Sequence, residues 1–177
     1  MITVVIVGIL AALAAYGVIK YINLSKSSEP IQMIGSIKAA QEAYRADMLS
    51  YLDVSGSHDI TAASYFPATT TAGKKTRSWQ EVVGSETPIG LGFKRLGVNP
   101  DGPVRYIYAS AAGSVSEKPA GHQLPTESVL NWPTAAIGQP WYVVAAKGDM
   151  DGDGLDSAYA AASFTSQIFI DHLREGE

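Results

Sequence analysis

The 177-residue sequence contains no cysteine, so it has neither a disulfide framework nor a thiolate for metal binding or nucleophilic catalysis. Charged residues make up only 17% of it, against about 25% in an ordinary soluble domain. There is no block of Lys and Arg, and the net charge is −4, which argues against a nucleic-acid partner. An apolar fraction of 46% excludes wholesale disorder. We therefore expect one folded unit with no specific nucleic-acid site.

Charge is absent from the first 19 residues, in which Thr3 is the only side chain more polar than tyrosine. As a helix, this stretch would reach roughly 28 Å, close to the hydrocarbon thickness of a bilayer. A cleaved secretory signal would open with a basic region, and a core helix is usually shorter, but both alternatives stay open. The pattern favours a membrane or membrane-like helix, in which Gly8 and Gly17 allow neighbouring helices to approach closely.

A polar run from Lys20 to Pro30 changes this pattern and predicts a bend. Ser28 is a candidate cap for a new helix, with Pro30 just inside it. Apolar side chains then recur at helical spacing, which predicts an amphipathic half-helix over residues 30–52 that packs on its own domain. The apolar stripe consists of Ile31, Ile34, Ile37, Ala40, Tyr44, Met48 and Tyr51.

Loops and strands are expected over residues 53–177, and the Ser-, Thr-, Ala- and Gly-rich part before Lys75 is expected on the surface. Turn signals separate several short apolar runs, which favours an antiparallel meander beside the helix. The sequence thus predicts an α+β fold, with an apolar half-helix and polar bend over residues 1–29 and a globular head over residues 30–177. The strand candidates are residues 91–96, 104–110, 141–146 and 158–170.

The first 14 residues, MITVVIVGILAALA, resemble the N-terminal helix of type IV pilins and of the related pseudopilins. Residues 37–45, IKAAQEAYR, resemble the second half-helix of that family. Three short C-terminal segments resemble pilins of deltaproteobacterial and myxobacterial type. They are the Pro140-Trp141 pair, the acidic and glycine-rich residues 148–154, and the final Glu-Gly-Glu. In the family a cleaved leader and the residues F-T-L-I-E-L precede such a stretch. The glutamate of that motif is tied to subunit docking, and no residue of this chain is assigned its role.

The resemblance implies a long N-terminal helix, apolar in its first half and amphipathic in its second, packed on an antiparallel sheet. It also implies a function. Before assembly, such subunits are anchored in the inner membrane. The pilus assembly machinery in that membrane then adds them to an extracellular filament, which is a helical polymer of many copies. The filament serves adhesion, twitching motility or DNA uptake. Helix flexibility is expected at Gly8, Gly17 and Pro30. One face of the apolar helix is expected to form the filament core, namely Ile2, Val5, Ile6, Ile9, Leu10 and Leu13.

Two other functions share the same anchor. One is a pseudopilin of a type II secretion system. The other is a monomeric membrane-anchored binding module, for which calcium dependence is left open. No enzyme activity is expected. Ser57-His58-Asp59 contains the residue types of a catalytic triad, but residues adjacent in sequence cannot adopt the triad geometry.

An acidic loop near the C-terminus is the candidate metal site. Asp149, Asp151 and Asp153, with Gly154, match positions 1, 3, 5 and 6 of a calcium-binding loop, and Ser157 takes position 9. Ala160 stands at position 12, where a bidentate glutamate belongs, so the loop is incomplete. A weak calcium site and a metal-free Asp-Gly turn both stay open, and no cofactor is required.

Overall fold

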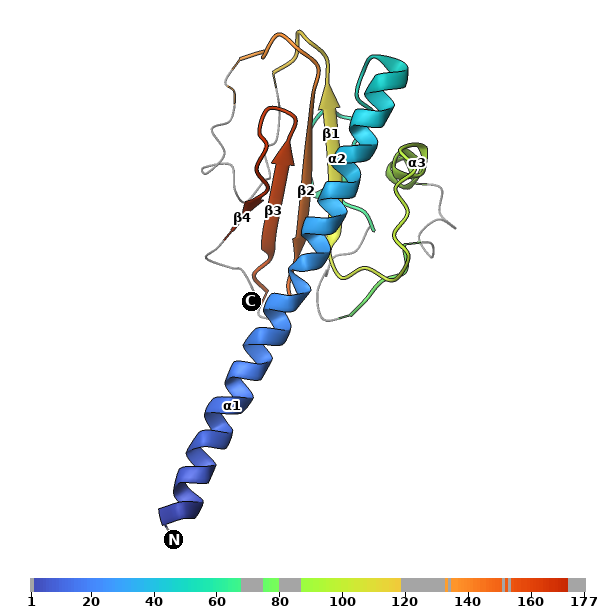
Figure 1. Ribbon diagram of the computed structural model, residues 1–177. Helices are drawn as coiled ribbons and strands as arrows, with labels where there is room; N and C mark the ends of the chain where they lie inside the picture. Colours follow the sequence, from blue (N-terminus) through green and yellow to red (C-terminus); the bar gives the residue numbers. More distant parts are fainter. Residues whose placement is uncertain are drawn as a thin grey trace.

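The computed structural model describes residues 2–67, 75–79, 87–118, 133, 135–150, 152 and 154–171, apart from the side chains of residues 19, 20, 23 and 24. A helix projects from a compact head and carries the N-terminus at its far end (Figure 1). Helix α1 spans Ile2–Lys26 and helix α2 spans Ser28–Met48. The predicted α+β class, with an N-terminal helix and an antiparallel sheet, is confirmed.

The helix is interrupted at a single residue, Ser27, rather than over the predicted polar run. Pro30 has no N–H to donate to the carbonyl four residues earlier, so the helical ladder is weakened at this point. Ser28 is the first residue of α2 and not its cap; Ser27 precedes the helix and makes no side-chain capping bond. The Ser28 hydroxyl donates instead to the Ser25 carbonyl, at 2.9 Å. The predicted bend over residues 20–30 is therefore wrong, since the helix is interrupted at one residue only and α1 continues in line with α2 (Figure 1).

The sheet has four strands in chain order, all antiparallel: β1 (Ile107–Gly113), β2 (Trp141–Gly148), β3 (Ser157–Ala162) and β4 (Phe169–Ile170). The predicted meander is confirmed. Two of the strand candidates, 104–110 and 141–146, overlap β1 and β2, while 158–170 contains two strands instead of one.

The candidate strand at residues 91–96 is wrong, because this segment lies in helix α3 (Pro88–Arg95). Its start follows the usual rules, with Pro88 as the first helical residue and Thr87 as the cap. The Thr87 hydroxyl accepts a hydrogen bond from the Gly90 N–H at 3.2 Å.

Helix α2 packs on one face of the sheet, above β2 and β3. The predicted stripe is partly wrong: Ile34 and Ile37 are fully buried, but Ile31 and Met48 face solvent. Gln41 is buried in their place. Its amide donates to the Leu52 carbonyl (2.8 Å) and accepts from the Leu52 N–H (3.0 Å), so its polar atoms are satisfied.

The segment after α2 was predicted to lie on the surface, but its described residues 53–67 contribute to the core; residues 68–74 lie outside the described residues. Val54, Ile60, Tyr65 and Phe66 are all buried. The Phe66 ring meets the Trp79 ring edge-on, with centroids 4.8 Å apart. Small polar residues dominate the composition of this segment. Its few large apolar side chains were therefore not recognised as core residues from the sequence.

The opposite face of the sheet is rich in alanine and is buried as well, through Ala109, Ala145 and Ala160 among others. The Trp141 side chain crosses the end of β1, where a Cβ on Gly113 would overlap the indole ring. The indole N–H donates to the Glu117 carbonyl at 2.9 Å. Both sheet faces are therefore occupied within the described residues.

Candidate functional site

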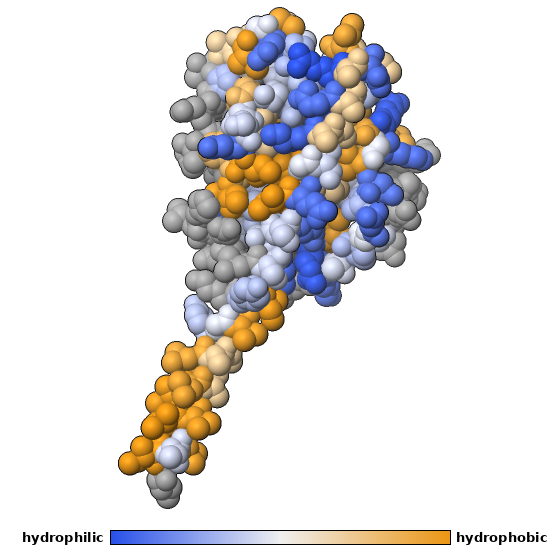
Figure 2. Space-filling model, viewed as in Figure 1, coloured by the Kyte–Doolittle hydropathy of each residue, from blue (hydrophilic) through white to orange (hydrophobic). Residues whose placement is uncertain are grey.

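Most of the large apolar side chains that are exposed in the described residues lie on α1. From Ile2 to Val18 every side chain is exposed. Figure 2 shows apolar residues all along the protruding helix, whereas the head mixes polar and apolar residues. Among the described residues, we find no helix that combines the length and apolar character needed to cross a membrane.

The six residues predicted for a filament core all lie on this surface. Their exposed fractions run from 50% at Ile6 to 78% at Ile2, and Val5, Ile9, Leu10 and Leu13 fall between these values. Apolar residues outside the predicted face are equally exposed, for example Val4 and Val7. The single chain therefore presents an apolar cylinder rather than one apolar face, which is the pattern of a helix that becomes covered on all sides.

The two glycines of α1 make no close packing contact with the described part of the chain, since a Cβ on Gly8 or Gly17 would meet nothing within 4 Å. Glycine in the middle of a helix costs about 1 kcal/mol relative to alanine. Such positions are useful where another helix approaches closely. Their place on a bare helix therefore fits contacts made outside this chain.

Glu29 fastens the first turn of α2 to the entry of β1. Its Oε1 atom accepts hydrogen bonds from the N–H groups of Arg105 (2.8 Å) and Tyr106 (3.2 Å) and from the hydroxyl of Tyr108 (3.1 Å). Burial first, and the Glu29 charge second, raise the pKa of Tyr108, so its hydroxyl stays protonated and donates. This contact fixes the head immediately after the interruption at Ser27.

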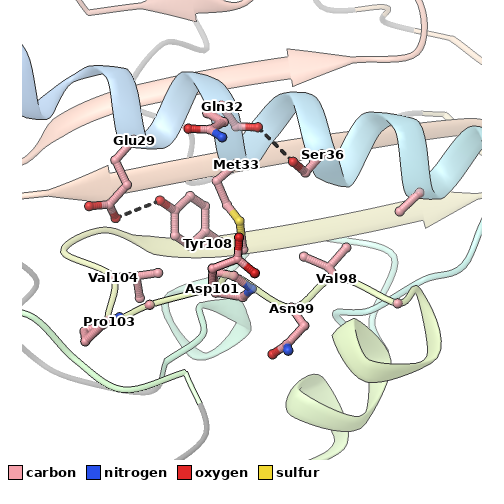
Figure 3. A pocket seen from close by; sticks show the side chains of 14 residues that line it. Glu29, Gln32, Met33, Ser36, Val98, Asn99, Asp101, Pro103, Val104 and Tyr108 are labelled. Atoms are coloured by element: carbon pink, nitrogen blue, oxygen red, sulfur yellow. Dashed lines mark hydrogen bonds between the residues drawn. The ribbon is translucent and has the colours of Figure 1, made fainter.

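A groove opens beside Glu29, between α2 and residues 97–104 (Figure 3). Its volume is about 470 Å³. Met33, Val98 and Val104 are buried beneath it, and Glu29 and Asp101 contribute carboxylates to its walls. The arrangement combines an apolar floor with charged walls.

Neither Glu29 nor this groove was predicted from the sequence. An acidic residue in the first turn of a helix was the only local signal, and it is explained equally well by the helix dipole. The partners of Glu29 lie more than 70 positions further along the chain. Only the packing of α2 on the sheet brings them together.

The acidic loop is only partly described. Asp149 lies just after β2, and its carboxylate accepts hydrogen bonds from the N–H groups of Gly152 and of Gly154, the latter at 3.0 Å. Asp151 and Asp153 lie outside the described residues. Ser157 is buried at the start of β3. The loop therefore has the contacts of a tight turn, and calcium binding stays a prediction.

No group of three or more His, Cys, Asp or Glu side chains that could hold a metal is present in the described part of the chain.

The Ser57-His58-Asp59 segment fastens a loop to the end of β1. The His58 Nδ1 atom lies 2.6 Å from the Ala112 carbonyl oxygen, and the Ser57 hydroxyl donates to the Asp59 carbonyl at 3.2 Å. The contact with Ala112 is the main reason that the pKa of His58 is raised, since the Nδ1–H group of the imidazole donates a hydrogen bond to this carbonyl oxygen. These contacts hold a loop in which His58 has a positive φ of 56°.

Comparison with known proteins adds no assignment: no family model, no curated protein and no solved structure matches this chain.

Proposed function

We propose that this protein is a structural subunit of a type IV pilus, in which α1 packs against the α1 helices of other copies and the head faces outward. The observation that carries the proposal is the apolar surface of α1, exposed on all sides from Ile2 to Val18. Apolar surface in water costs about 25 cal/mol per Å², so a helix of this kind requires a cover.

The cover cannot come from the head, as far as the structure describes it. Helix α2 occupies one face of the sheet, and the alanine-rich face is buried too. Helix α1 continues the line of α2 away from the sheet (Figure 1). Its partners therefore lie outside the described part of the chain, and both lipid and further copies of the helix provide an apolar environment.

In the proposed function, the apolar environment of α1 changes when the subunit enters the filament. Before assembly, lipid of the inner membrane covers α1; after assembly, neighbouring α1 helices do. The exchange is inexpensive because lipid tails and aliphatic side chains are similarly apolar. The likeness of residues 1–14 and 37–45 to the pilin helix supports this sequence of events, as does a fold in which a helix packs on an antiparallel sheet.

Electron microscopy of purified cell-surface material tests the proposal. We expect filaments that contain this chain, and we expect Leu10→Asp to abolish them because it places a charge in the buried core. Val115→Asp is the matched control: Val115 is an exposed apolar residue of the head, so the same chemical change should leave filaments intact. Binding of an antibody to the folded head should be unchanged in both variants.

Two outcomes would contradict the proposal or part of it. A native protein found only as a membrane-bound monomer would remove the filament function and favour the anchored binding module. Normal filaments from Leu10→Asp would show that the predicted core face is wrong, even if the filament itself is real.

A further inference from the structure

One imidazole and one carboxylate join the loop after α2 to the end of β1. The His58 Nδ1 atom lies 2.6 Å from the Ala112 carbonyl oxygen. The Asp53 carboxylate accepts hydrogen bonds from the N–H of His58 (3.0 Å) and from the N–H of Ala112 (3.3 Å). The ends of α2 and β1 both lie at the end of the head that is farthest from the N-terminus (Figure 1). The contact therefore holds residues 53–59 in place at that end.

Two carboxylates act on the His58 ring, one from its own loop and one from the turn after β1. An Asp53 oxygen lies 3.6 Å from Nδ1, and the Asp53 side chain is only 14% exposed. The charge of Glu117 also favours a protonated ring. Glu117 accepts a hydrogen bond from the Ser114 N–H at 2.7 Å, which is the main reason that its pKa is lowered. Within the described residues, no Lys or Arg forms an ion pair with either carboxylate.

The strength of the contact depends on the proton of the ring. A protonated imidazole donates from both nitrogens, whereas a neutral imidazole donates from only one of them. The neutral ring of His58 keeps its bond to Ala112 only in the tautomer that carries the proton on Nδ1. It also loses the attraction to Asp53 and Glu117. Loss of the proton therefore weakens the contact for two reasons.

We propose that His58 is a pH-sensitive clamp, which holds residues 53–59 against the end of β1 when it is protonated and releases them as the pH rises. The loop is prepared for release, because His58 has a φ of 56°. Few residues other than glycine adopt this conformation, and contacts must hold it. The inference rests on the head alone and does not depend on the filament.

The direction of the effect follows from the pKa of His58. The hydrogen bond to Ala112 is the largest cause that raises this pKa above its ordinary value of 6.5. Partial burial opposes the rise, and the charges of Asp53 and Glu117 add to it. A group whose pKa is raised on folding stabilises the folded state fully below its unfolded pKa, and this contribution is lost as the pH rises through the folded pKa. The clamp is therefore closed in acid and opens above neutral pH.

NMR of the full ¹⁵N-labelled chain in a non-ionic detergent, between about pH 5.5 and pH 8.5, tests the proposal. The ring signals of His58 should titrate with a pKa above 6.5, and the amide signal of Ala112 should shift with the same midpoint. Hydrogen exchange measures the opening itself. The protection factor of the His58 amide, corrected for the intrinsic effect of pH on exchange, should fall about threefold from the acidic to the alkaline end.

Three variants separate the clamp from a merely structural contact. His58→Asn removes the titrating group but tolerates a positive φ, so protection at position 58 should no longer depend on pH. Glu117→Gln should lower the pKa of His58, because it removes a charge while its amide oxygen can still accept the Ser114 N–H. Asp101→Asn is the matched control and should leave that pKa unchanged, since Asp101 is an exposed carboxylate beside the start of α2.

Four results would overturn the proposal. The first is a pKa of His58 at or below 6.5, and the second is a protection factor that does not change with pH in the unsubstituted chain. The third is an unchanged pH dependence in His58→Asn, and the fourth is an equal effect of Glu117→Gln and Asp101→Asn on the pKa. The first two are measured without any substitution, so a variant that fails to fold leaves the test intact.

Discussion

Helices α1 and α2 follow one another in the chain, yet their relation to the rest of the molecule is opposite. Helix α1 carries no charge before Lys20 and has no buried side chain among those described. Helix α2 contains five charged residues, and it buries Pro30, Met33, Ile34, Ile37 and Gln41. The more apolar helix is thus the exposed one. An apolar helix needs another apolar surface to cover it. Whether its side chains are buried in the single chain depends on whether that surface belongs to the same chain.

The sharpest test of this comparison is the same substitution in each helix. Ile37→Ala should lower the free energy of unfolding of the head by about 3 kcal/mol, since Ile37 is fully buried and its loss leaves a cavity. Ile9→Ala should change it by less than about 0.5 kcal/mol, because Ile9 is 57% exposed. Denaturant unfolding of the full chain in a non-ionic detergent, followed by the fluorescence of the buried tryptophans, measures both values. A large loss from Ile9→Ala would mean that α1 packs on the head.

A smaller effect is expected at the one polar side chain that α2 buries. Gln41→Leu should destabilise the head by about 2 kcal/mol, because it leaves the N–H and C=O of Leu52 without these partners. Gln32→Leu on the same helix is the control, since Gln32 is exposed and its change should stay within about 0.5 kcal/mol. If both variants were equally stable, the Gln41 hydrogen bonds would contribute nothing net.

The smallest predicted change in the free energy of unfolding is at the end of α2, and here the substitution is expected to stabilise the head. Leu49 caps the helix with a positive φ of 60° and is 83% exposed. Leu49→Gly should therefore stabilise the head by about 1 kcal/mol, because glycine adopts this conformation without strain. Met48→Gly, one residue earlier and still helical, should destabilise it by a similar amount. Loss of stability in both variants would show that the Leu49 side chain makes a contact that its exposure does not reveal.

Periodicity and turn signals predicted the main elements. The break in composition near Pro30 indicated two helical segments, and the start of β2 at Trp141 agrees with its candidate. The strand expected at residues 91–96 is wrong, and the helix that replaces it, α3, contains two glycines, Gly90 and Gly92. In the structure Gly92 lies against Val54, where a Cβ would come within 2.8 Å of the valine Cγ1. That glycine is required by close packing between segments far apart in sequence, which a local pattern does not show.

The sequence by itself determined that a helix without charge over its first 19 residues leads into a mixed head and that this apolar part needs a cover. These features depend on local composition and on the period of the helix. The tertiary structure alone decided that Ser27 interrupts the helix, that Gln41 replaces Met48 on the buried side, and that Glu29 joins α2 to β1. Hydrogen bonds and packing between distant segments fix these features, because each depends on a partner that only the folded chain brings within reach.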